Sequence, residues 1–578
     1  MFYSLLKIGE ITDHEFMFEK IKKEGDICFV IFDNDNKNVT FKRIRLGDGD
    51  EKKYAYIGDA TASKPQDSIT TRYPDRIFGF YISKGKRLPA NKFALKVVAN
   101  KLKGTQTGRM LEKVLNWYKP EEWKEKILNE KNQWKDCVLY TVKVKENNRD
   151  IEIATEEDYR NSIIFSGESE SGKCQFCGKS IVLKNPDYPN GTLLKIFIVD
   201  KKGFLPGLAE SAIPLAHSVC PECREKLVRG DRYVEQNLNS KIRDLNIYVI
   251  PEMSTRATKE FLGKFKINNE GYIFERLHEL SIGELTAEQV AGEIEDARLI
   301  FVIGNKENAK FRIKKVIPEV RYLRLVETIK AFRIAESVIF NNAKNHCISA
   351  PTISFGDLYD ILPVEKKGGK DPKYFIEFFE SMLLQVPLSK SYVYSVFLRS
   401  LRCNRYKTCV NSNTNTKDLE CVSLLAETYI YAMAKLNVMD INVKYEEASD
   451  PISYAKNLGL NEGLIGVFLL GVLTAYVGTA QYKKGDEKKA ILNKIDFEGM
   501  DTNDIIVYSN RLFESLKNYK LLNSYVERLF YDATSRIVSG NKDLSDPQQN
   551  VFYLLLGYSY QTYQAINNKI EVNETQES

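Results

Sequence analysis

The sequence predicts an α+β protein, and three observations predict this class. Alternating apolar and polar residues form hairpin patterns in the first third, two CxxC pairs stand near the middle, and apolar helical patterns dominate after residue 319. We expect a mixed N-terminal α/β domain with antiparallel hairpins (1–160), an inserted subdomain around the CxxC pairs (161–245), a mixed β then helical region (246–430) and a C-terminal all-α bundle (431–578).

The charge of the chain is unevenly distributed. Residues 431–578 hold 15 Lys and Arg against 19 Asp and Glu, a net charge of −4, and since the whole chain carries +6, residues 1–430 carry +10. A basic front predicts a polyanionic partner for that part. The N-terminus lacks a signal-peptide pattern, and the longest apolar run, Leu464–Val477, is too short to span a bilayer. We therefore expect a cytoplasmic protein with no membrane partner.

The first region alternates helical and strand patterns. Glu10–Lys23 predicts a helix, Ile27–Phe32 is an apolar run typical of a buried strand, and Val39–Leu46 alternates as its hairpin partner. A helical stretch after residue 109 contains all three tryptophans. We expect these large rings to pack in a core or against a partner rather than to stack on bases. They are Trp117, Trp123 and Trp134.

Two loops of this region combine basic residues with glycine. The first, between residues 63 and 92, interleaves its cations with aromatic residues, and the second spans Lys103–Arg109. Such loops suit contact with a nucleic-acid backbone, and a solvated hairpin explains the first loop equally well. The candidate nucleic-acid-binding residues are Lys84, Lys86, Arg87, Lys92, Lys103 and Arg109.

The sharpest motif is a pair of CxxC knuckles. Cys174 and Cys177 form the first, Cys220 and Cys223 the second, and 42 residues separate them. Four thiolates from two knuckles make a tetrahedral structural zinc site, so we predict one Zn²⁺ and a zinc-binding subdomain. A disulfide or redox pair is the alternative. His217 could replace one ligand, although a surface or supporting histidine is the more ordinary interpretation.

The 42 residues between the two pairs predict a small folded insertion, here called the excursion, in which Leu193–Val199 is a strand. The other six cysteines are scattered and predict buried free thiols of a reducing compartment. They are Cys28, Cys137, Cys347, Cys403, Cys409 and Cys421.

No catalytic constellation stands out, so we expect no enzyme and no catalytic residue. Gly167–Cys174 nearly matches a phosphate-binding loop, but Cys174 stands where a magnesium-binding hydroxyl belongs and two acids lie inside the loop. We expect a flexible loop there. The four histidines are far apart in sequence and do not form the pairs of a metal-dependent nuclease. They are His14, His217, His278 and His346.

After the excursion, the patterns are first β and then helical. Leu245–Ile250 predicts a strand, and Leu299–Ile303 pairs with Lys310–Ile317 as a hairpin. Basic residues along the second hairpin strand and the junction that follows would form a cationic face. The candidates for nucleic-acid contact there are Lys314, Lys315, Arg321 and Arg324.

The rest of the chain is helical. A helix over Ser395–Val410 places Arg399, Arg402 and Arg405 near one another, with Lys407 after them; this face could follow phosphates, although a solvated face is the commoner meaning. Four apolar helical stretches then predict a four-helix bundle. They are Cys421–Leu436, Leu464–Gln481, Asp504–Val538 and Val551–Asn567.

Together these features resemble a known family. The chain resembles the large subunit of type I-B CRISPR Cascade complexes, of the Csh type. The features that carry this resemblance are the opening Met1–Glu10, the CxxC…CxxC insertion, the strand-to-helix junction Lys310–Arg324 and a helical block containing Phe468–Leu473. The resemblance covers most of the chain in layout. It implies a non-catalytic subunit of an RNA-guided DNA surveillance complex in antiviral defence.

The resemblance also implies partners. The N-terminal part would hold the guide complex and help to recognise the protospacer-adjacent motif (PAM) on duplex DNA, and the helical part would lie beside the displaced strand of the R-loop. Partners would be CRISPR RNA, duplex target DNA, the Cascade backbone subunits, a small subunit and a recruited helicase-nuclease. Relatives can make such a small subunit from an internal start, for which Met439 is better placed than Met433. Two core methionines of one continuous domain are an equally good interpretation.

Two other classes of function stay open. The first is a zinc-containing nucleic-acid-processing enzyme, such as a nuclease, which metal-dependent cleavage by the pure protein would favour. The second is a stand-alone DNA-binding regulator, which tight specific binding without guide RNA would favour.

Overall fold

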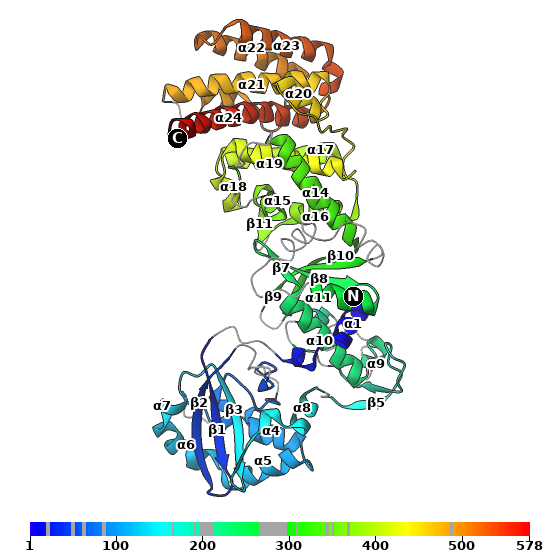
Figure 1. Cartoon of the computed structure of the whole chain (residues 1–578), viewed down its shortest axis with the longest axis vertical. Helices are drawn as coiled ribbons and strands as arrows, with labels where there is room; N and C mark the ends of the chain where they lie inside the picture. The colour runs from blue at the N-terminus through cyan, green and yellow to red at the C-terminus, as the bar shows by residue number, and fades with distance from the viewer. Residues whose placement is uncertain are drawn as a thin grey trace. The chain divides into compact units, whose positions relative to one another are not determined.

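The chain divides into two compact units. The first comprises Met1–Asn239, Tyr248–Asn269 and Gly304–Lys314, and the second comprises Ser240–Ile247, Glu270–Ile303 and Lys315–Ser578. The computed structural model shown in Figure 1 describes residues 1–18, 24–47, 53–59, 65–83, 88–164, 167–186, 188–189, 192–196, 207, 212–264, 297–307, 310–340, 346–348, 352–366, 370–485 and 489–577. The predicted α+β class is confirmed, with sheets in the first part, the cysteine cluster in the middle and helices at the C-terminal end.

A mixed four-stranded sheet organises the start of unit 1. Its order is β2-β1-β3-β4, where β1 is Asp26–Asp33, β2 is Asn38–Arg45, β3 is Leu139–Glu146 and β4 is Arg149–Glu152. The predicted hairpin of β1 and β2 is confirmed, with Asp33 opposite Asn38. However, β1 also pairs with β3 in parallel, and a parallel pair needs a long crossover connection.

The crossover is helical, as predicted for the tryptophan-containing stretch. It contains α3 (Pro74–Phe78), α4 (Ala94–Lys101), α5 (Gln106–Trp117), α6 (Pro120–Asn129) and α7 (Lys131–Trp134). Figure 1 shows α4 and α5 beside the sheet. The rings of Trp117 and Trp123 lie 5.5 Å apart, and Trp134 is buried against Phe78. Trp134 packs in the core as expected, whereas Trp117 and Trp123 are half-buried and pack against each other.

The N-terminal helix begins earlier than predicted. Helix α1 spans Phe2–Ile11 and a 3₁₀ turn follows at His14–Met17, so the predicted helix over Glu10–Lys23 is wrong as far as the described residues reach. Leu5 and Ile8, three residues apart, bury their side chains on one face of α1. Extended backbone at Thr12 ends the helix. Burial of that early apolar pair therefore decided where the helix lies.

The second four-stranded sheet has the order β10-β9-β8-β7. Its strands are β7 (Asn239–Ile242), β8 (Leu245–Glu252), β9 (Arg298–Glu307) and β10 (Lys310–Arg321). The predicted strand and hairpin are confirmed, and β10 extends four residues beyond its predicted end. The division between the two units runs through these strands, and α11 (Thr255–Lys264) belongs to unit 1.

Unit 2 continues with a series of helices. They are α14 (Tyr322–Ile339), α15 (Phe355–Ile361), α16 (Lys373–Leu384), α17 (Lys390–Arg405), α18 (Ser412–Thr416) and α19 (Leu419–Lys435). Helix α15 begins with a capping box between Ser354 and Asp357. Strands β11 (Glu365–Lys366) and β12 (Lys370–Asp371) pair antiparallel between α15 and α16.

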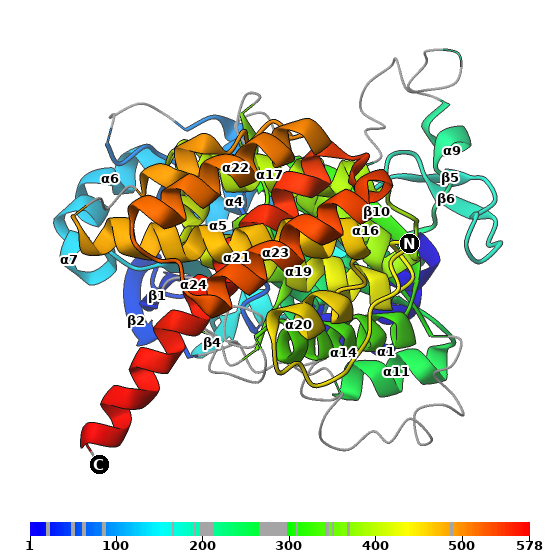
Figure 2. The ribbon, with the colours of Figure 1, turned by 90° about the horizontal axis from the view of Figure 1, so that it is seen from above.

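The C-terminal end of unit 2 is a helical bundle, as predicted. It contains α20 (Pro451–Asn457), α21 (Glu462–Lys483), α22 (Thr502–Asn518), α23 (Ser524–Ser539) and α24 (Pro547–Glu577), which Figure 2 shows from above. The stretch Asp504–Val538 is two helices, because Lys520 takes a positive φ and the side chain of Asn523 caps α23.

Helix α21 is long and apolar enough to cross a membrane by length and composition alone. Yet 83% of its most apolar window is buried inside the unit, which is what the core helix of a bundle requires.

The expectation that all six scattered cysteines are free thiols is wrong for four of them. Cys347 forms a disulfide with Cys421, and Cys403 forms one with Cys409. The first pair is 74 residues apart in sequence, so only the packing of distant segments brings it together. Cys28 and Cys137 remain free and buried.

Candidate metal centre

The first knuckle is the tight turn of a small hairpin. Cys174 and Cys177 lie between β5 (Ser169–Ser171) and β6 (Ile181–Leu183), which pair antiparallel. Gly178 supplies the positive φ that the turn needs, and its N–H donates to the carbonyl of Cys174 at 2.9 Å. The backbone therefore bends both thiols toward one point.

The second knuckle is the N-terminus of a helix. Cys220 caps α10 (Pro221–Asn237), and its sulfur accepts from the N–H of Cys223 at 3.4 Å. Pro221 occupies the first helical position, where a missing N–H costs nothing. The positive end of the helix dipole favours negative charge on these thiols.

Backbone hydrogen bonds join the two knuckles. The N–H of Gln175 donates to the carbonyl of Ser218 at 2.9 Å, and the N–H of Leu183 donates to that of Val219 at 2.9 Å. The N–H of Cys220 donates to the sulfur of Cys174 at 3.4 Å. The two views of the ribbon place β5 and α9 (Ile213–Ala216) near each other beside this junction (Figures 1 and 2).

The four sulfur atoms converge into one cluster. Those of Cys174, Cys177, Cys220 and Cys223 all lie within 4.8 Å of one another, so the cluster could hold a metal ion. A tetrahedral site with zinc–sulfur bonds of about 2.3 Å separates its sulfurs by about 3.8 Å. The gap between the sulfurs of Cys177 and Cys220 is 3.6 Å. Distances and donor set thus fit zinc, and the sequence prediction of these four ligands agrees with the geometry.

The electrostatics favour a thiolate at Cys174. Burial raises the pKa of this thiol, but backbone N–H groups of Cys177, Cys220 and Phe176 donate to it and bring the pKa down to about 7. Burial raises the pKa values of Cys220 and Cys223, and the neighbouring thiols of the cluster add to the rise. A cation among them would offset that repulsion.

His217 lies beside the cluster but is not one of the four ligands. Its ring is buried, its Nδ1 accepts from the amide of Gln175 at 3.2 Å, and its Nε2 shares a hydrogen bond of 2.6 Å with the hydroxyl of Tyr188. Burial lowers its pKa to about 4, so the ring is neutral. The expectation of a supporting rather than a ligating histidine agrees with this placement, and no sequence pattern pointed to Gln175 and Tyr188 as its partners.

Helix α1 packs against the first knuckle. The ring of Tyr3 meets Phe176 edge-on at 5.4 Å, and the Tyr3 hydroxyl donates to the carbonyl of Gln175 at 3.3 Å. Lys226 of α10 pairs with Glu10 at 2.6 Å. The N-terminal helix therefore holds both sides of the cysteine cluster.

Within the excursion, the predicted strand Leu193–Val199 is wrong where it is described. Residues Leu193–Ile196 form a 3₁₀ helix, because the N–H of Leu193 donates to the carboxylate of Asp231 on α10 at 2.9 Å. The near match to a phosphate loop, Gly167–Cys174, contains β5 and leads into the knuckle instead of a helix.

The basic candidates of unit 1 differ in exposure. Lys84, Lys86 and Arg87 lie outside the described residues. Lys103 and Arg109 are exposed at the start of α5. Lys92 is only 8% exposed, and burial together with the charge of Arg76 lowers its pKa. A buried ammonium reaches a phosphate less readily than an exposed one.

The candidates around β10 also fall into two kinds. Arg321 is exposed and Lys314 is half-buried, whereas Lys315 pairs with Glu380 at 2.7 Å. Arg324 is turned inward: its guanidinium donates to the carbonyls of Met382 and Leu436 at 2.8 Å each. These carbonyls end α16 and α19, so Arg324 caps two helices.

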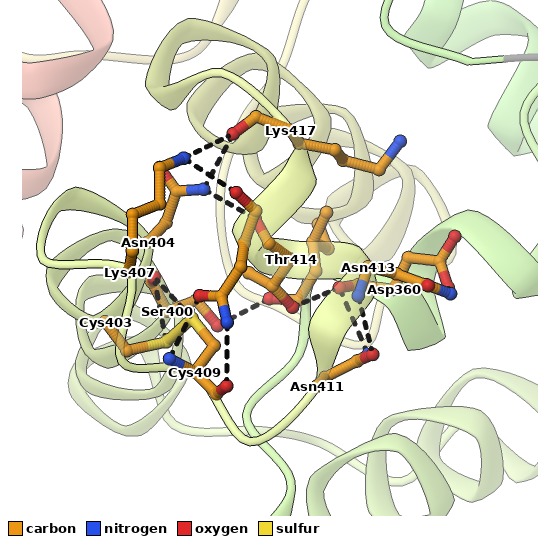
Figure 3. The surroundings of a disulfide bond; sticks show 12 residues. Asp360, Ser400, Cys403, Asn404, Lys407, Cys409, Asn411, Asn413, Thr414 and Lys417 are labelled. Atoms are coloured by element: carbon orange, nitrogen blue, oxygen red, sulfur yellow. Dashed lines mark hydrogen bonds between the residues drawn. A yellow bond between two sulfur atoms is a disulfide. The ribbon is translucent and has the colours of Figure 1, made fainter.

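The basic residues of α17 are held by neighbours. Arg399 donates to the hydroxyl of Tyr374 at 2.7 Å, Arg402 pairs with Glu498, and Arg405 donates to Asn493 at 3.1 Å. Figure 3 shows Lys407 near the Cys403–Cys409 disulfide; its ammonium donates to the carbonyls of Asn415 and Lys417. Each of these four cations already has a hydrogen-bond partner.

Two segments of the chain match models of known protein domains. Residues 171–320 match the central domain, and residues 353–572 the C-terminal domain, of CRISPR-associated protein TM1802 (cas_TM1802). No curated protein matches the chain. The cysteine cluster lies inside the first match and the helices α15–α24 make up the second. Together the two matches cover more than half of the sequence, and the chain belongs to the CRISPR-associated TM1802 family.

Proposed function

We propose that this chain is the non-catalytic large subunit of a type I-B CRISPR RNA-guided DNA surveillance complex (Cascade). The observation that carries the proposal is the pair of TM1802 domains, which together span residues 171–320 and 353–572. The Csh-type resemblance of the sequence supports the finer assignment to type I-B. In this role the protein helps to recognise the PAM and to stabilise the R-loop.

The metal centre supports a structural rather than a catalytic role. Four thiolates fill the coordination of a tetrahedral Zn²⁺ and leave no position for a substrate or an activated water. The ion would be held by Cys174, Cys177, Cys220 and Cys223. It would cross-link the β5–β6 hairpin to the start of α10. The zinc then contributes to folding free energy.

The charge distribution supports DNA contact by the front of the chain. Residues 1–430 carry +10, and unit 1 exposes Lys103 and Arg109 beside the N-terminus of α5. Cations on such a surface bind phosphates and release counterions, which makes binding depend on salt. The other predicted DNA-binding cations of unit 1 are Lys84, Lys86 and Arg87.

We further propose the partners that this role requires. They are CRISPR RNA, duplex target DNA, the Cascade backbone subunits, a small subunit and a recruited helicase-nuclease, all acting in the cytoplasm. The bundle from α20 to α24 is the part proposed to lie beside the displaced strand.

The test is reconstitution with guide RNA and backbone subunits. We expect the chain to co-purify with them and to bind a matched duplex more tightly than one lacking the PAM, without cutting either strand. A duplex that keeps the PAM but has a scrambled protospacer is the control for guide dependence. Metal-dependent cleavage by the pure protein would instead establish the nuclease alternative, and tight specific binding without RNA would establish a stand-alone regulator.

A further inference from the structure

A second group of metal-ligating side chains lies in unit 2, far in sequence from the four-cysteine cluster. The ligand atoms of His346, Cys347 and Cys421 all lie within 4.8 Å of one another. In this structure the two sulfurs form a disulfide. Histidine nitrogen beside two cysteine sulfurs is a donor set typical of zinc proteins.

Packing independent of the disulfide brings the three residues together. Cys421 stands in the first turn of α19, and both cysteines are 5% exposed. Lys417, just before α19, donates from its ammonium to the carbonyl of Cys347 at 2.8 Å. The ring of His346 stacks on Tyr563 of α24, with centroids 4.8 Å apart and planes 12° apart. The segment 346–348, α19 and α24 therefore meet at one point within unit 2.

We propose that the reduced form of this group is a second, redox-gated Zn²⁺ site with His346, Cys347 and Cys421 as ligands. A dithiol reductant supplies two electrons and two protons to the Cys347–Cys421 bond; it becomes a disulfide itself, and the protein gains two thiols. Each thiol then releases its proton to solvent as its sulfur binds the ion. Metal and disulfide exclude each other, because both use the same sulfurs.

The surroundings of His346, Cys347 and Cys421 favour binding of Zn²⁺. The N-terminal end of α19 favours a thiolate at Cys421 through the helix dipole. His346 is exposed, so a metal can enter from solvent, and three protein ligands leave the fourth position to water. This arrangement differs from the four-cysteine cluster, whose ligand set is complete.

The second disulfide provides an internal comparison. Cys403 and Cys409 are also bonded, but among the residues that the structure describes they belong to no group of three metal ligands. Around them Figure 3 shows Asn404, Lys407 and Asn411, whose nitrogens donate to backbone carbonyls. Reduction of this pair yields two thiols without a third ligand, and we expect no tight site there.

The experiment counts zinc in the full-length protein in both redox states. One sample is oxidised; the other is reduced with a dithiol and desalted without oxygen; both are then equilibrated with Zn²⁺ and dialysed. We expect one ion per oxidised chain and two per reduced chain. Cobalt(II) in place of zinc should add a thiolate charge-transfer band on reduction.

Three variants make the result specific. Cys421→Ser should remove the second ion, and His346→Ala, an exposed position that folding should tolerate, should weaken the second site at least about tenfold. Cys403→Ser is the matched control and should keep two ions after reduction. An equal zinc content in both redox states, or a second ion that survives both Cys421→Ser and His346→Ala, would overturn the proposal.

Discussion

Gly9 of α1 and Gly230 of α10 lie where the two helices cross with their backbones in contact. A Cβ on Gly9 would stand 1.8 Å from the carbonyl oxygen of Lys226, and one on Gly230 would stand 1.9 Å from that of Leu5. No other residue type fits without moving a helix. Since α10 begins with the second knuckle and α1 packs on the first, this crossing positions the metal centre.

We expect Gly230→Ala to force α1 and α10 apart. Overpacking of this kind costs about 1–3 kcal/mol of unfolding free energy, so Tm should fall in a thermal melt and zinc should be released more readily. Gly263→Ala in α11 is the matched control, because a Cβ there meets nothing within 4 Å. In an exposed helix that change should be neutral or stabilising by up to about 1 kcal/mol. Identical melts of Gly230→Ala and the parent protein would contradict this account.

Removal of one zinc ligand should unfold the excursion locally. Structural zinc contributes on the order of 10 kcal/mol in small domains, and Cys174→Ser leaves three ligands and an incomplete site. We expect loss of one zinc by metal analysis and rapid proteolysis between the two knuckles. Cys137→Ser, a change at a free thiol outside the cluster, should keep the zinc. Cys174→Ser protein that retains a full complement of zinc would rule the assignment out.

Loss of the candidate DNA-binding cations of unit 1 should reduce the salt dependence of DNA binding. In the assembled complex, Lys103→Ala/Arg109→Ala should lower the slope of log K against log salt by about two units, since each phosphate contact contributes about one. The triple change Lys84→Ala/Lys86→Ala/Arg87→Ala should lower it by about three. Lys103→Arg/Arg109→Lys, which keeps both positive charges, is the control and should leave the slope unchanged. An unchanged slope would identify the loop in question as a solvated turn.

Arg324→Ala should destabilise unit 2 rather than weaken DNA binding selectively. The change leaves the carbonyls of Met382 and Leu436 without their donor, at a cost of about 2–3 kcal/mol. Denaturant unfolding measures this loss. Arg321→Ala, at an exposed neighbour, should stay within about 0.5 kcal/mol. The reverse order of the two stabilities would show that Arg324 is not a helix cap.

The C-terminal bundle should fold as a fragment, with a stability that depends on α19. The family resemblance implies a product with an internal start, for which Met439 is the better position. However, α24 also packs on α17 and α19, and the hydroxyls of Tyr394 and Tyr553 share a hydrogen bond of 2.8 Å. We expect Met439–Ser578 to be helical by circular dichroism and to melt below Leu419–Ser578, which retains α19. A disordered Met439–Ser578 would refute the independent bundle. A native complex that contains full-length chain alone would refute the internal product.

Short-range patterns sufficed for much of the fold. The alternation in Val39–Leu46 predicted β2, and the continuous apolar stretch Leu464–Gln481 predicted α21, because both patterns arise within a few residues. The helix over Glu10–Lys23 was wrong for the opposite reason: burial against α10, more than 200 residues away in sequence, selected Phe2–Ile11 instead. Local propensity does not include such a partner.

In the candidate metal site, too, the sequence determined some features and the tertiary structure determined others. The spacing of each CxxC pair determined by itself which thiols could share a metal, since two residues between cysteines let both sulfurs reach one point from a single turn. Only the tertiary structure decided that the two pairs meet, that His217 turns to Gln175 and Tyr188, and that Cys347 reaches Cys421. It also directed Arg324 and Lys407 to backbone carbonyl oxygens. The physical reason is that the residue type alone determines whether a side chain is charged, whereas its hydrogen-bond partners belong to distant segments that pack beside it only in the folded chain.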